Sequence, residues 1–271
     1  MPTVSIIVPA RNEEACLSAC LESLVAQRDP DCEIIVVDDA STDRTREIAA
    51  SFPVRLISAP ALPSGCSGKC NAVQAGADAA RGEWLLFTDA DTVHAPGSLS
   101  RALAEVRAHH ADLLSYSPHQ EVKGILERAV MTVIFAELAS TFQPRDVCDP
   151  NSPAAAANGQ YLLISRDAYD AVGGHRGVAH TLLEDVALAQ NVKRTGRRIH
   201  FRYGGDQVRT RMYRSLGALW EGWTRTWRCC FPEPCASLSD APSNLSRLPA
   251  ESPPPLPDWP CTNAHCLPPA S

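Results

Sequence analysis

The sequence lacks several features that would assign it to large classes of protein. No stretch approaches the roughly 18 continuous apolar residues of a membrane-spanning helix, and residues 1–8 lack the basic and long apolar regions of a signal peptide. We therefore expect a cytoplasmic protein. The net charge of −6 over 271 residues argues against a generic nucleic-acid binder, so no nucleic-acid partner is expected.

Three common ligand-binding motifs are also missing. The first β-branched run is followed by Pro-Ala-Arg-Asn-Glu, where a dinucleotide-binding domain needs Gly-x-Gly-x-x-Gly. The segment Gly65-Cys-Ser-Gly-Lys69-Cys lacks the spacing of a Walker loop and the Ser or Thr after its lysine. Eleven cysteines are present, but their spacing does not form a zinc ribbon. Cys16 and Cys20, like Cys66 and Cys70, are four residues apart, a spacing that on a helix indicates small buried residues rather than metal ligands.

Strand-like and helix-like patterns alternate through residues 1–115. Short apolar runs at 4–8, 33–37, 54–57 and 82–88 predict buried strands, and helical patterns lie between them. Asn12 is the expected N-cap of the first helix. This alternation predicts an α/β fold with a mostly parallel sheet covered by helices on both faces.

Polar and acidic residues follow three of these strands. They are Pro9 to Glu13, Asp38 to Asp43 and Asp89 to Asp91. Helix capping explains the Ser and Thr of the second segment but not Asp38 and Asp39 together. Because such sheets bind ligands beyond the carboxyl ends of their strands, we expect the three segments to share one site. Asp89 and Asp91, two apart on an extended chain, would face the same cation or polar ligand.

The second half is less regular. Residues 124–141 predict a helix with a broad apolar face, for which core packing is a more ordinary explanation than membrane contact. Asn158-Gly159-Gln160 precedes a strand at 161–164. Leu183-Glu184-Asp185 opens a helix to about Arg194, and acids are favoured at a helix N-terminus without any function.

The end of the chain changes character twice. Between Lys193 and Arg228, ten Lys or Arg residues stand against two acidic ones, and apolar residues that include three tryptophans recur at helical spacing from Tyr213 to Trp227. Such a helix fits either an anionic membrane surface or a solvated face over the core. Residues 228–271 hold eleven of the 22 prolines and predict a disordered tail.

Six short motifs, in order, resemble those of family 2 glycosyltransferases, which are inverting enzymes with the GT-A fold. They are Val8-Pro9-Ala-Arg-Asn-Glu-Glu, Val37-Asp38-Asp39-Ala-Ser-Thr-Asp43, Gly68-Lys69, Thr88-Asp89-Ala-Asp91, Asn158-Gly-Gln160 and Leu183-Glu184-Asp185. Arg209-Thr-Arg-Met-Tyr213 and Trp220-Glu-Gly-Trp223 further resemble the hopanoid-biosynthesis-associated branch. The resemblance implies a GT-A domain over residues 1–227, with a nucleotide-sugar-binding half (1–115) and an acceptor half (116–227).

The resemblance also implies roles for single residues. Asp185, preceded by Glu184, would be the general base, and Asp89 and Asp91 would hold a divalent cation, Mg²⁺ or Mn²⁺. The remaining residues would bind the nucleotide sugar: Pro9, Arg11, Glu13, Asp38, Asp39, Lys69, Asp89, Asn158, Gly159, Gln160 and Arg211.

The implied reaction moves a sugar from a nucleotide diphosphate sugar, expected to be a UDP-sugar, to a lipid, polyisoprenoid or hopanoid-type acceptor. The Trp-rich basic helix would give peripheral contact with the inner face of the plasma membrane. Members of this branch usually continue into apolar spanning segments, and a shifted reading frame or truncated gene would produce the tail found here instead. Two alternatives follow: an inactive nucleotide-sugar-binding remnant, or a nucleotidyltransferase, although the basic glycine-rich loop of the latter is missing.

Overall fold

A computed structural model describes residues 2–211, except 28–30, 64, 123 and 182. The predicted Trp-rich helix and the tail at 228–271 lie outside the described residues. The strands are β1 Val4–Ala10, β2 Cys32–Asp38, β3 Arg55–Ser58, β4 Trp84–Phe87, β5 Thr92–His94, β6 Leu113–Ser117, β7 His119–Gln120, β8 Leu162–Ser165, β9 Ile199–Tyr203 and β10 Val208–Thr210. The helices are α1 Leu17–Val25, α2 Thr45–Ala50, α3 Gly68–Ala79, α4 Ser98–His109, α5 Ile125–Thr141, α6 Pro144–Cys148, α7 Arg166–Ala171, the 3₁₀ helix η1 Gly174–Val178 and α8 Glu184–Arg194.

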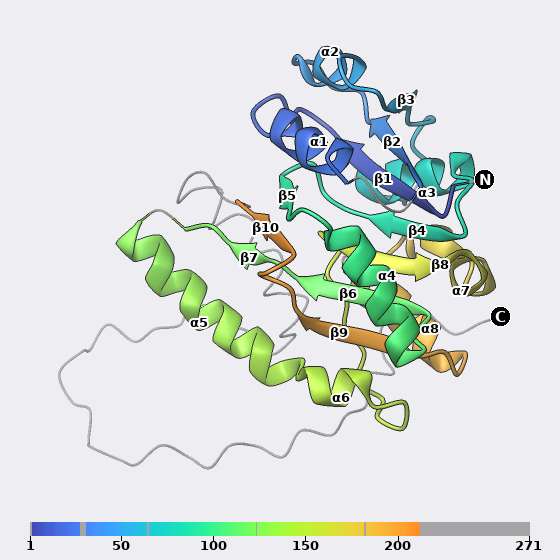
Figure 1. Cartoon of the computed structure of the whole chain (residues 1–271), viewed down its shortest axis with the longest axis vertical. Coiled ribbons are helices and arrows are strands. Elements are labelled where there is room, and N and C mark those ends of the chain that lie inside the picture. Colours follow the sequence, from blue (N-terminus) through green and yellow to red (C-terminus); the bar gives the residue numbers. More distant parts are fainter. Residues whose placement is uncertain (1, 28–30, 64, 123, 182, 212–271) are drawn as a thin grey trace, which may run out of the picture. The chain divides into compact units, whose positions relative to one another are not determined.

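Within the described residues, seven strands form the main sheet in the order β3-β2-β1-β4-β8-β6-β9. Only β8 runs against its neighbours, since β8 pairs antiparallel with both β4 and β6 while the other pairs are parallel. This is a mostly parallel α/β sheet, as the sequence predicted (Figure 1). The parallel strands are buried on both faces, which explains why they read as continuous apolar runs.

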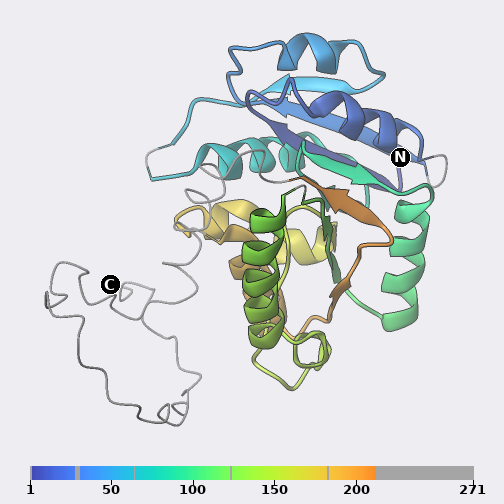
Figure 2. The ribbon, with the colours of Figure 1, turned by 90° about the vertical axis from the view of Figure 1, so that its left-hand side faces the viewer.

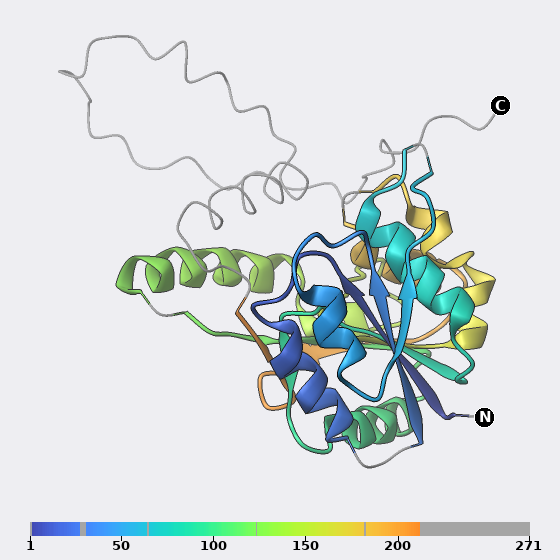
Figure 3. The same ribbon diagram turned by 90° about the horizontal axis from the view of Figure 1, so that it is seen from above.

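Two layers of helices cover the sheet. Alternate residues of β1 point to opposite faces: Ile6 packs with α1 and α4, whereas Ile7 packs with α3. In Figure 3, α1 and α4 lie on one side of the strands and α3 on the other. The second face is completed by α6, α7 and α8. Because both faces are covered, a ligand can reach this sheet only at the ends of its strands.

A second, three-stranded sheet, β5-β10-β7, was not predicted as a sheet. Its strands are two or three residues long and carry no readable periodicity. It returns the chain to the carboxyl edge of the main sheet, because Thr210 pairs with Thr92, immediately after Asp91. Its role is therefore to bring the segment ending at Arg211 beside the predicted site.

Helix α5 lies on the side towards which β6 and β9 point, the side that Figure 2 views (Figures 1 and 2). Met131 and Ile134 are buried, as core packing requires, but Val133 is 69% exposed and Val130 is 37% exposed. The apolar face predicted for this helix is thus only partly covered by the described part of the chain. None of the helices described is long and apolar enough to cross a membrane.

The expected N-cap of the first helix is wrong. Helix α1 begins at Leu17, and Asn12 lies five residues earlier with a left-handed backbone (φ 56°). Its side-chain oxygen accepts a hydrogen bond from the backbone N–H of Thr42, at 2.9 Å. Asn12 therefore joins the loop after β1 to the loop after β2 rather than starting a helix.

Candidate nucleotide-sugar site

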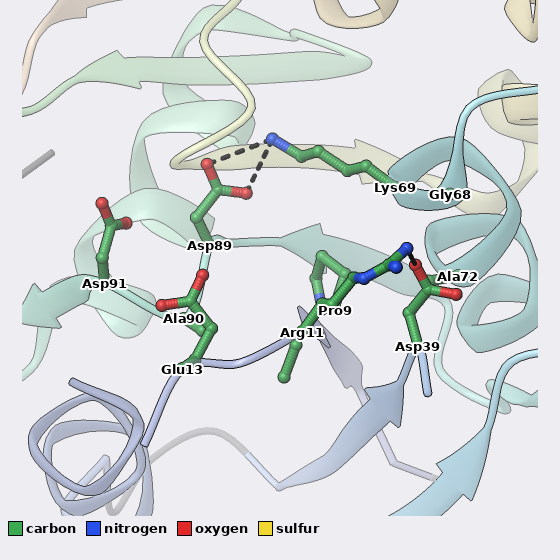
Figure 4. Close-up of a pocket in the computed structure, with 11 residues that line it drawn as sticks. Pro9, Arg11, Glu13, Asp39, Gly68, Lys69, Ala72, Asp89, Ala90 and Asp91 are labelled. Carbon is green, nitrogen blue, oxygen red and sulfur yellow. Dashed lines mark hydrogen bonds and ion pairs between the residues drawn. The ribbon is translucent and has the colours of Figure 1, made fainter. Parts of the chain in front are cut away.

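The carboxyl ends of β1, β2 and β4 and the first turn of α3 surround a cavity of about 340 Å³ (Figure 4). The three polar segments singled out in the sequence therefore meet at one edge of the sheet. The cavity is lined by Pro9, Ala10, Arg11, Glu13, Asp39, Gly68, Lys69, Ala72, Asp89, Ala90 and Asp91.

On one wall, Arg11 pairs with Asp39. The guanidinium Nη1 lies 3.3 Å from Asp39 Oδ2, and the arginine side chain is mostly exposed. Gly68 makes this arrangement possible, because a Cβ at this position would stand 2.6 Å from Asp39 Oδ2. Asp39 thus sits against the N-terminus of α3, where the helix dipole favours a negative charge.

On the opposite wall, Lys69 bridges the end of β4 and the start of α8. Its Nζ lies 2.8 Å from Asp89 Oδ1 and 3.8 Å from Glu184 Oε1. Desolvation of the ammonium group lowers the pKa of Lys69, but Asp89, Glu184 and Asp185 outweigh it and raise the pKa, so the lysine is charged. A cation is therefore fixed between the end of β4 and the start of α8.

Asp91 is the exceptional group of the cavity. Its Oδ1 is buried without a hydrogen-bond partner among the described residues. Burial and the neighbouring charge of Asp89 raise the pKa of Asp91 to about 6. A hydrogen bond from Thr210 to this carboxylate lowers its pKa, but within the described part of the chain Oδ1 is left without a partner, and a cation would supply one. The donor set therefore fits a cation.

Asp89 and Asp91 do not share a direction for the predicted reason, because they do not lie on an extended strand. Strand β4 ends at Phe87, and Asp89 to Asp91 form a turn closed by Thr92, whose hydroxyl donates to the Asp89 carbonyl at 2.8 Å. Both carboxylates still face the cavity (Figure 4). In the part of the chain that is described, no three His, Cys, Asp or Glu side chains are grouped to hold a metal. A hard divalent ion here would complete its shell with substrate phosphate oxygens and water.

A small recess adjoins the cavity and contains the predicted base. Asp185 lies in the first turn of α8, and its two oxygens accept hydrogen bonds from the Gly159 N–H (2.9 Å) and the Val186 N–H (2.8 Å). Burial raises the pKa of Asp185 and that of Glu184. A carboxylate with a raised pKa is a stronger base, which suits proton abstraction.

Four predicted site residues do not line the cavity or the recess. Asp38 is buried and pairs with Arg46 at 3.3 Å. The side-chain oxygen of Asn158 accepts from the Gln160 N–H within its own turn. Gln160 is buried and donates to Thr210 Oγ1 at 3.3 Å. Arg211 follows the last paired residue of β10 and so lies near Asp91 in register.

Sequence reasoning missed His175 in the recess. It is 4% exposed and lines the recess with Lys69, Gly159 and Asp185. The available signal was the Gly173-Gly174 pair before it, since a Cβ on Gly174 would stand 2.6 Å from the Tyr169 ring and its φ is 58°. A glycine is needed where the backbone passes this close to the Tyr169 ring, and this close approach fixes the position of the next residue, His175.

Comparison with known proteins decides the family. The model of "Glycosyl transferase family 2" matches residues 5–173, which is more than half of the chain. The chain belongs to this family. The match covers the whole lining of the 340 Å³ cavity, whereas Asp185 and Arg211 lie beyond it. The resemblance to the hopanoid-associated branch stays a prediction.

Two curated relatives show how similar this chain is to known proteins. The 4,4'-diaponeurosporenoate glycosyltransferase of Staphylococcus haemolyticus is 29% identical over 235 residues, and that of Staphylococcus aureus (strain USA300) is 28% identical over 231 residues. Each alignment covers 82% of this chain and 60% of the relative. The chain therefore spans about 60% of the length of the curated relatives it matches.

Solved structures show the GT-A fold. The mannosyltransferase PcManGT from Pyrobaculum calidifontis, in complex with GDP-Man and Mn²⁺, superposes with a TM-score of 0.63 at 20% identity, over 84% of this chain and 62% of that one. Staphylococcus aureus TarS in complex with UDP-GlcNAc gives 0.58 at 21% identity, over 80% and 60%. At these identities the likeness concerns the fold.

Proposed function

We propose that this chain is an inverting glycosyltransferase that moves a sugar from a nucleotide diphosphate sugar, expected to be a UDP-sugar, to a lipid or polyisoprenoid acceptor. The observation that carries the proposal is the unpaired, buried Oδ1 of Asp91 in a cavity whose other wall holds Arg11 and Asp39. One side of this cavity suits a cation and a diphosphate, and the other suits a polar base and ribose. The bound partners named for PcManGT and TarS, GDP-Man with Mn²⁺ and UDP-GlcNAc, support this division.

In this proposal the donor lies along the carboxyl edge of the sheet. Asp39, beside Gly68, binds the uracil edge, and Pro9, Arg11 and Glu13 hold the base and ribose. Asp89 and Asp91 hold Mg²⁺ or Mn²⁺, which when bound neutralises charge on the leaving diphosphate. Lys69, 2.8 Å from Asp89, adds a fixed positive charge to the same place, and Arg211 adds a second from the end of β10.

Asp185 is proposed to take the proton from the acceptor hydroxyl. Both of its oxygens are oriented by backbone N–H groups, so the carboxylate is held in one direction without a side-chain partner that would have to move. Glu184 keeps Lys69 close to this base. Because the base is on the α8 side and the diphosphate is on the β4 side, in-line attack inverts the anomeric carbon and needs no protein nucleophile.

A lipid-like acceptor is supported by two observations. The curated relatives are named for 4,4'-diaponeurosporenoate. Helix α5, on the same side of the molecule as the site, exposes Val133 and Val130. We propose that the protein works at the inner face of the plasma membrane, with the Trp-rich stretch giving peripheral contact.

The full chain, incubated with UDP-glucose, UDP-N-acetylglucosamine or GDP-mannose, Mn²⁺ or Mg²⁺ and a membrane extract, should release nucleoside diphosphate. Asp185→Asn should lower turnover at least about 100-fold with donor affinity retained. The matched control is Asp167→Asn, which removes a carboxylate that is 86% exposed and remote from the cavity. Donor binding without release would indicate the inactive remnant, and pyrophosphate release from UTP and a sugar phosphate would indicate a nucleotidyltransferase.

A further inference from the structure

The recess beside the main cavity has room for one small polar group. Its lining includes Lys69, Gly159, His175 and Asp185, and its volume is about 10 Å³. That is the space of a single water or hydroxyl group. The main cavity opens next to it, because Pro9, Lys69 and Asp89 line both. A ligand in the main cavity could therefore reach into the recess with one hydroxyl.

A hydrogen-bond chain behind the recess fixes the protonation of His175, starting from an amide. The Gln74 Nε2 donates to Asp78 Oδ1 at 2.8 Å. A carboxylate only accepts, so the amide nitrogen must face Asp78 and the amide oxygen must face the other way. Gln74 Oε1 accordingly accepts from the Arg176 N–H at 3.0 Å and lies 3.2 Å from the Tyr169 hydroxyl.

The hydroxyl of Tyr169 links the orientation of the Gln74 amide to the position of the proton on the His175 imidazole. Its single proton is donated to Gln74 Oε1, which cannot donate in return. The Tyr169 oxygen is then an acceptor, and it accepts from the backbone N–H of His175 at 3.1 Å. His175 Nδ1, 2.8 Å from the same oxygen, must therefore also be a donor. This sets the neutral imidazole as the Nδ1–H form, with a lone pair on Nε2.

Two further contacts keep the ring neutral and in place. Burial and the charge of Lys69 lower the pKa of His175 to about 3, so the ring carries one proton. Phe87 meets the imidazole edge-on, with ring centroids 4.8 Å apart. His175 lines the recess, its Nδ1 is engaged with Tyr169, and no described residue bonds to Nε2, so the recess is where Nε2 can find a partner.

We propose that Nε2 of His175 accepts a hydrogen bond from a hydroxyl group of the donor sugar, making His175 a specificity residue. The inference rests on the proposed function, because it takes the sugar to hang from a diphosphate beside Lys69 and Asp89. A sugar there would direct one hydroxyl past Lys69 into the recess that His175 lines. A donor sugar with no hydroxyl in that direction would leave Nε2 without a hydrogen-bond partner and the recess empty.

The protonation state is tested without any substrate. Nitrogen-15 NMR of the full chain labelled at histidine should show His175 as Nδ1–H with an unprotonated Nε2, and Tyr169→Phe should shift it towards the other form. An Nε2–H imidazole in the wild type would overturn the inference. The same Nε2 resonance should move on adding the sugar nucleotide but not on adding UDP alone.

Two substitutions test the roles of the two ring nitrogens of His175 separately. His175→Asn keeps a donor near Tyr169 but removes the group in the recess, whereas His175→Gln places an amide where Nε2 stood. We expect His175→Asn to lower kcat/KM for the sugar nucleotide about tenfold with UDP affinity unchanged, and His175→Gln to restore most of it. His110→Asn, at an exposed turn, is the control.

The outcomes distinguish the two proposals. If the wild type turns over a sugar nucleotide and His175→Asn does so equally well, the role of His175 is wrong and the proposed function stands. If no sugar nucleotide binds to the wild-type protein or moves its His175 resonances, both proposals are wrong.

Discussion

At the residue scale, the site contains a charge that the folded protein accommodates poorly. Asp91 Oδ1 is buried and unpaired, and Asp89 lies two residues away with its own carboxylate already held by Lys69. A residue that weakens the fold while lining a cavity is typical of a binding site, because the missing partner arrives with the ligand.

This arrangement predicts that Asp91→Asn makes the protein more stable but less active. The neutral amide removes the repulsion from Asp89 and the cost of the buried charge, so the free energy of unfolding without ligand should rise by about 1 kcal/mol. Turnover should fall at least about 100-fold. Thermal unfolding with and without Mn²⁺ plus UDP measures the first effect: the ligands should stabilise the wild type and not the variant. A variant less stable than the wild type would contradict the assignment.

Gly68→Ala tests the other wall of the cavity. The new Cβ would stand 2.6 Å from Asp39 Oδ2, so the carboxylate must move away from α3. Since Ala is a better helix residue than Gly, the melting temperature should not fall. We expect about tenfold weaker UDP binding by calorimetry. Gly124→Ala is the matched control, because the nearest atom there is 3.7 Å away. Equal affinity in both variants would show that the position of Asp39 does not matter.

At the scale of elements, α8 is held at both ends. Its first turn carries Asp185, bound to the Gly159 N–H. Its last turn carries Lys193, whose Nζ donates to the carbonyl oxygens of Asp146, Val147 and Ala154. These carbonyls belong to the end of α6 and the segment after it, so one lysine joins α8 to the chain that leads towards Asn158 and Gly159.

Lys193→Met should therefore destabilise the protein without altering the chemistry. It keeps most of the side-chain volume but leaves three carbonyl oxygens without their donor, which should lower the free energy of unfolding by about 1–3 kcal/mol in urea. Arg194→Met removes the neighbouring cation, whose Nη1 donates to the Asn191 side chain of the same helix at 3.2 Å, and should change stability little. Equal stability of the two variants would mean that Lys193 does not anchor α8. Turnover at low temperature should be near that of the wild type for both.

At the scale of the whole molecule, the carboxylate of Glu33 links several strands at the edge of the sheet opposite the cavity. Glu33 on β2 accepts from the Ser5 hydroxyl on β1 at 2.7 Å and from the Arg81 N–H before β4, also at 2.7 Å. Arg81 adds an ion pair at 3.1 Å. Three strands are thus joined at their amino ends, far along the sheet from the ligand edge.

This contact predicts a pH dependence of stability. Burial alone would raise the pKa of Glu33, but the hydrogen bonds from Ser5 and Arg81 lower it below the ordinary 4.5. The stabilisation is therefore complete above pH 4.5 and is lost as the pH falls through the lowered value. Glu33→Gln should cost about 1–2 kcal/mol of unfolding free energy at pH 7, and this difference should shrink below pH 4.5. Glu47→Gln, at an exposed carboxylate, should show no such trend.

The sequence by itself determined most strands of the main sheet and the edge at which the cavity lies. Apolar runs such as Ile34 to Val37 become strands wherever both faces of the sheet are covered, and the polar residues after them must lie at the carboxyl edge. Strands of this kind depend on the local order of apolar and polar residues, which can be read directly from the sequence. The start of α8 at Glu184 was read in the same way.

Only the tertiary structure decided which side chains meet. Lys69 reaches Asp89 and Glu184, Gly159 reaches Asp185, and His175 enters the recess, and no local pattern encodes these distances. The same limit made Asn12 look like a helix cap, because its true partner, Thr42, lies 30 residues away. Contacts between distant segments are set by how the layers pack, and it is this packing that gathers the acidic loops around one cavity, with Asp185 in the recess beside it.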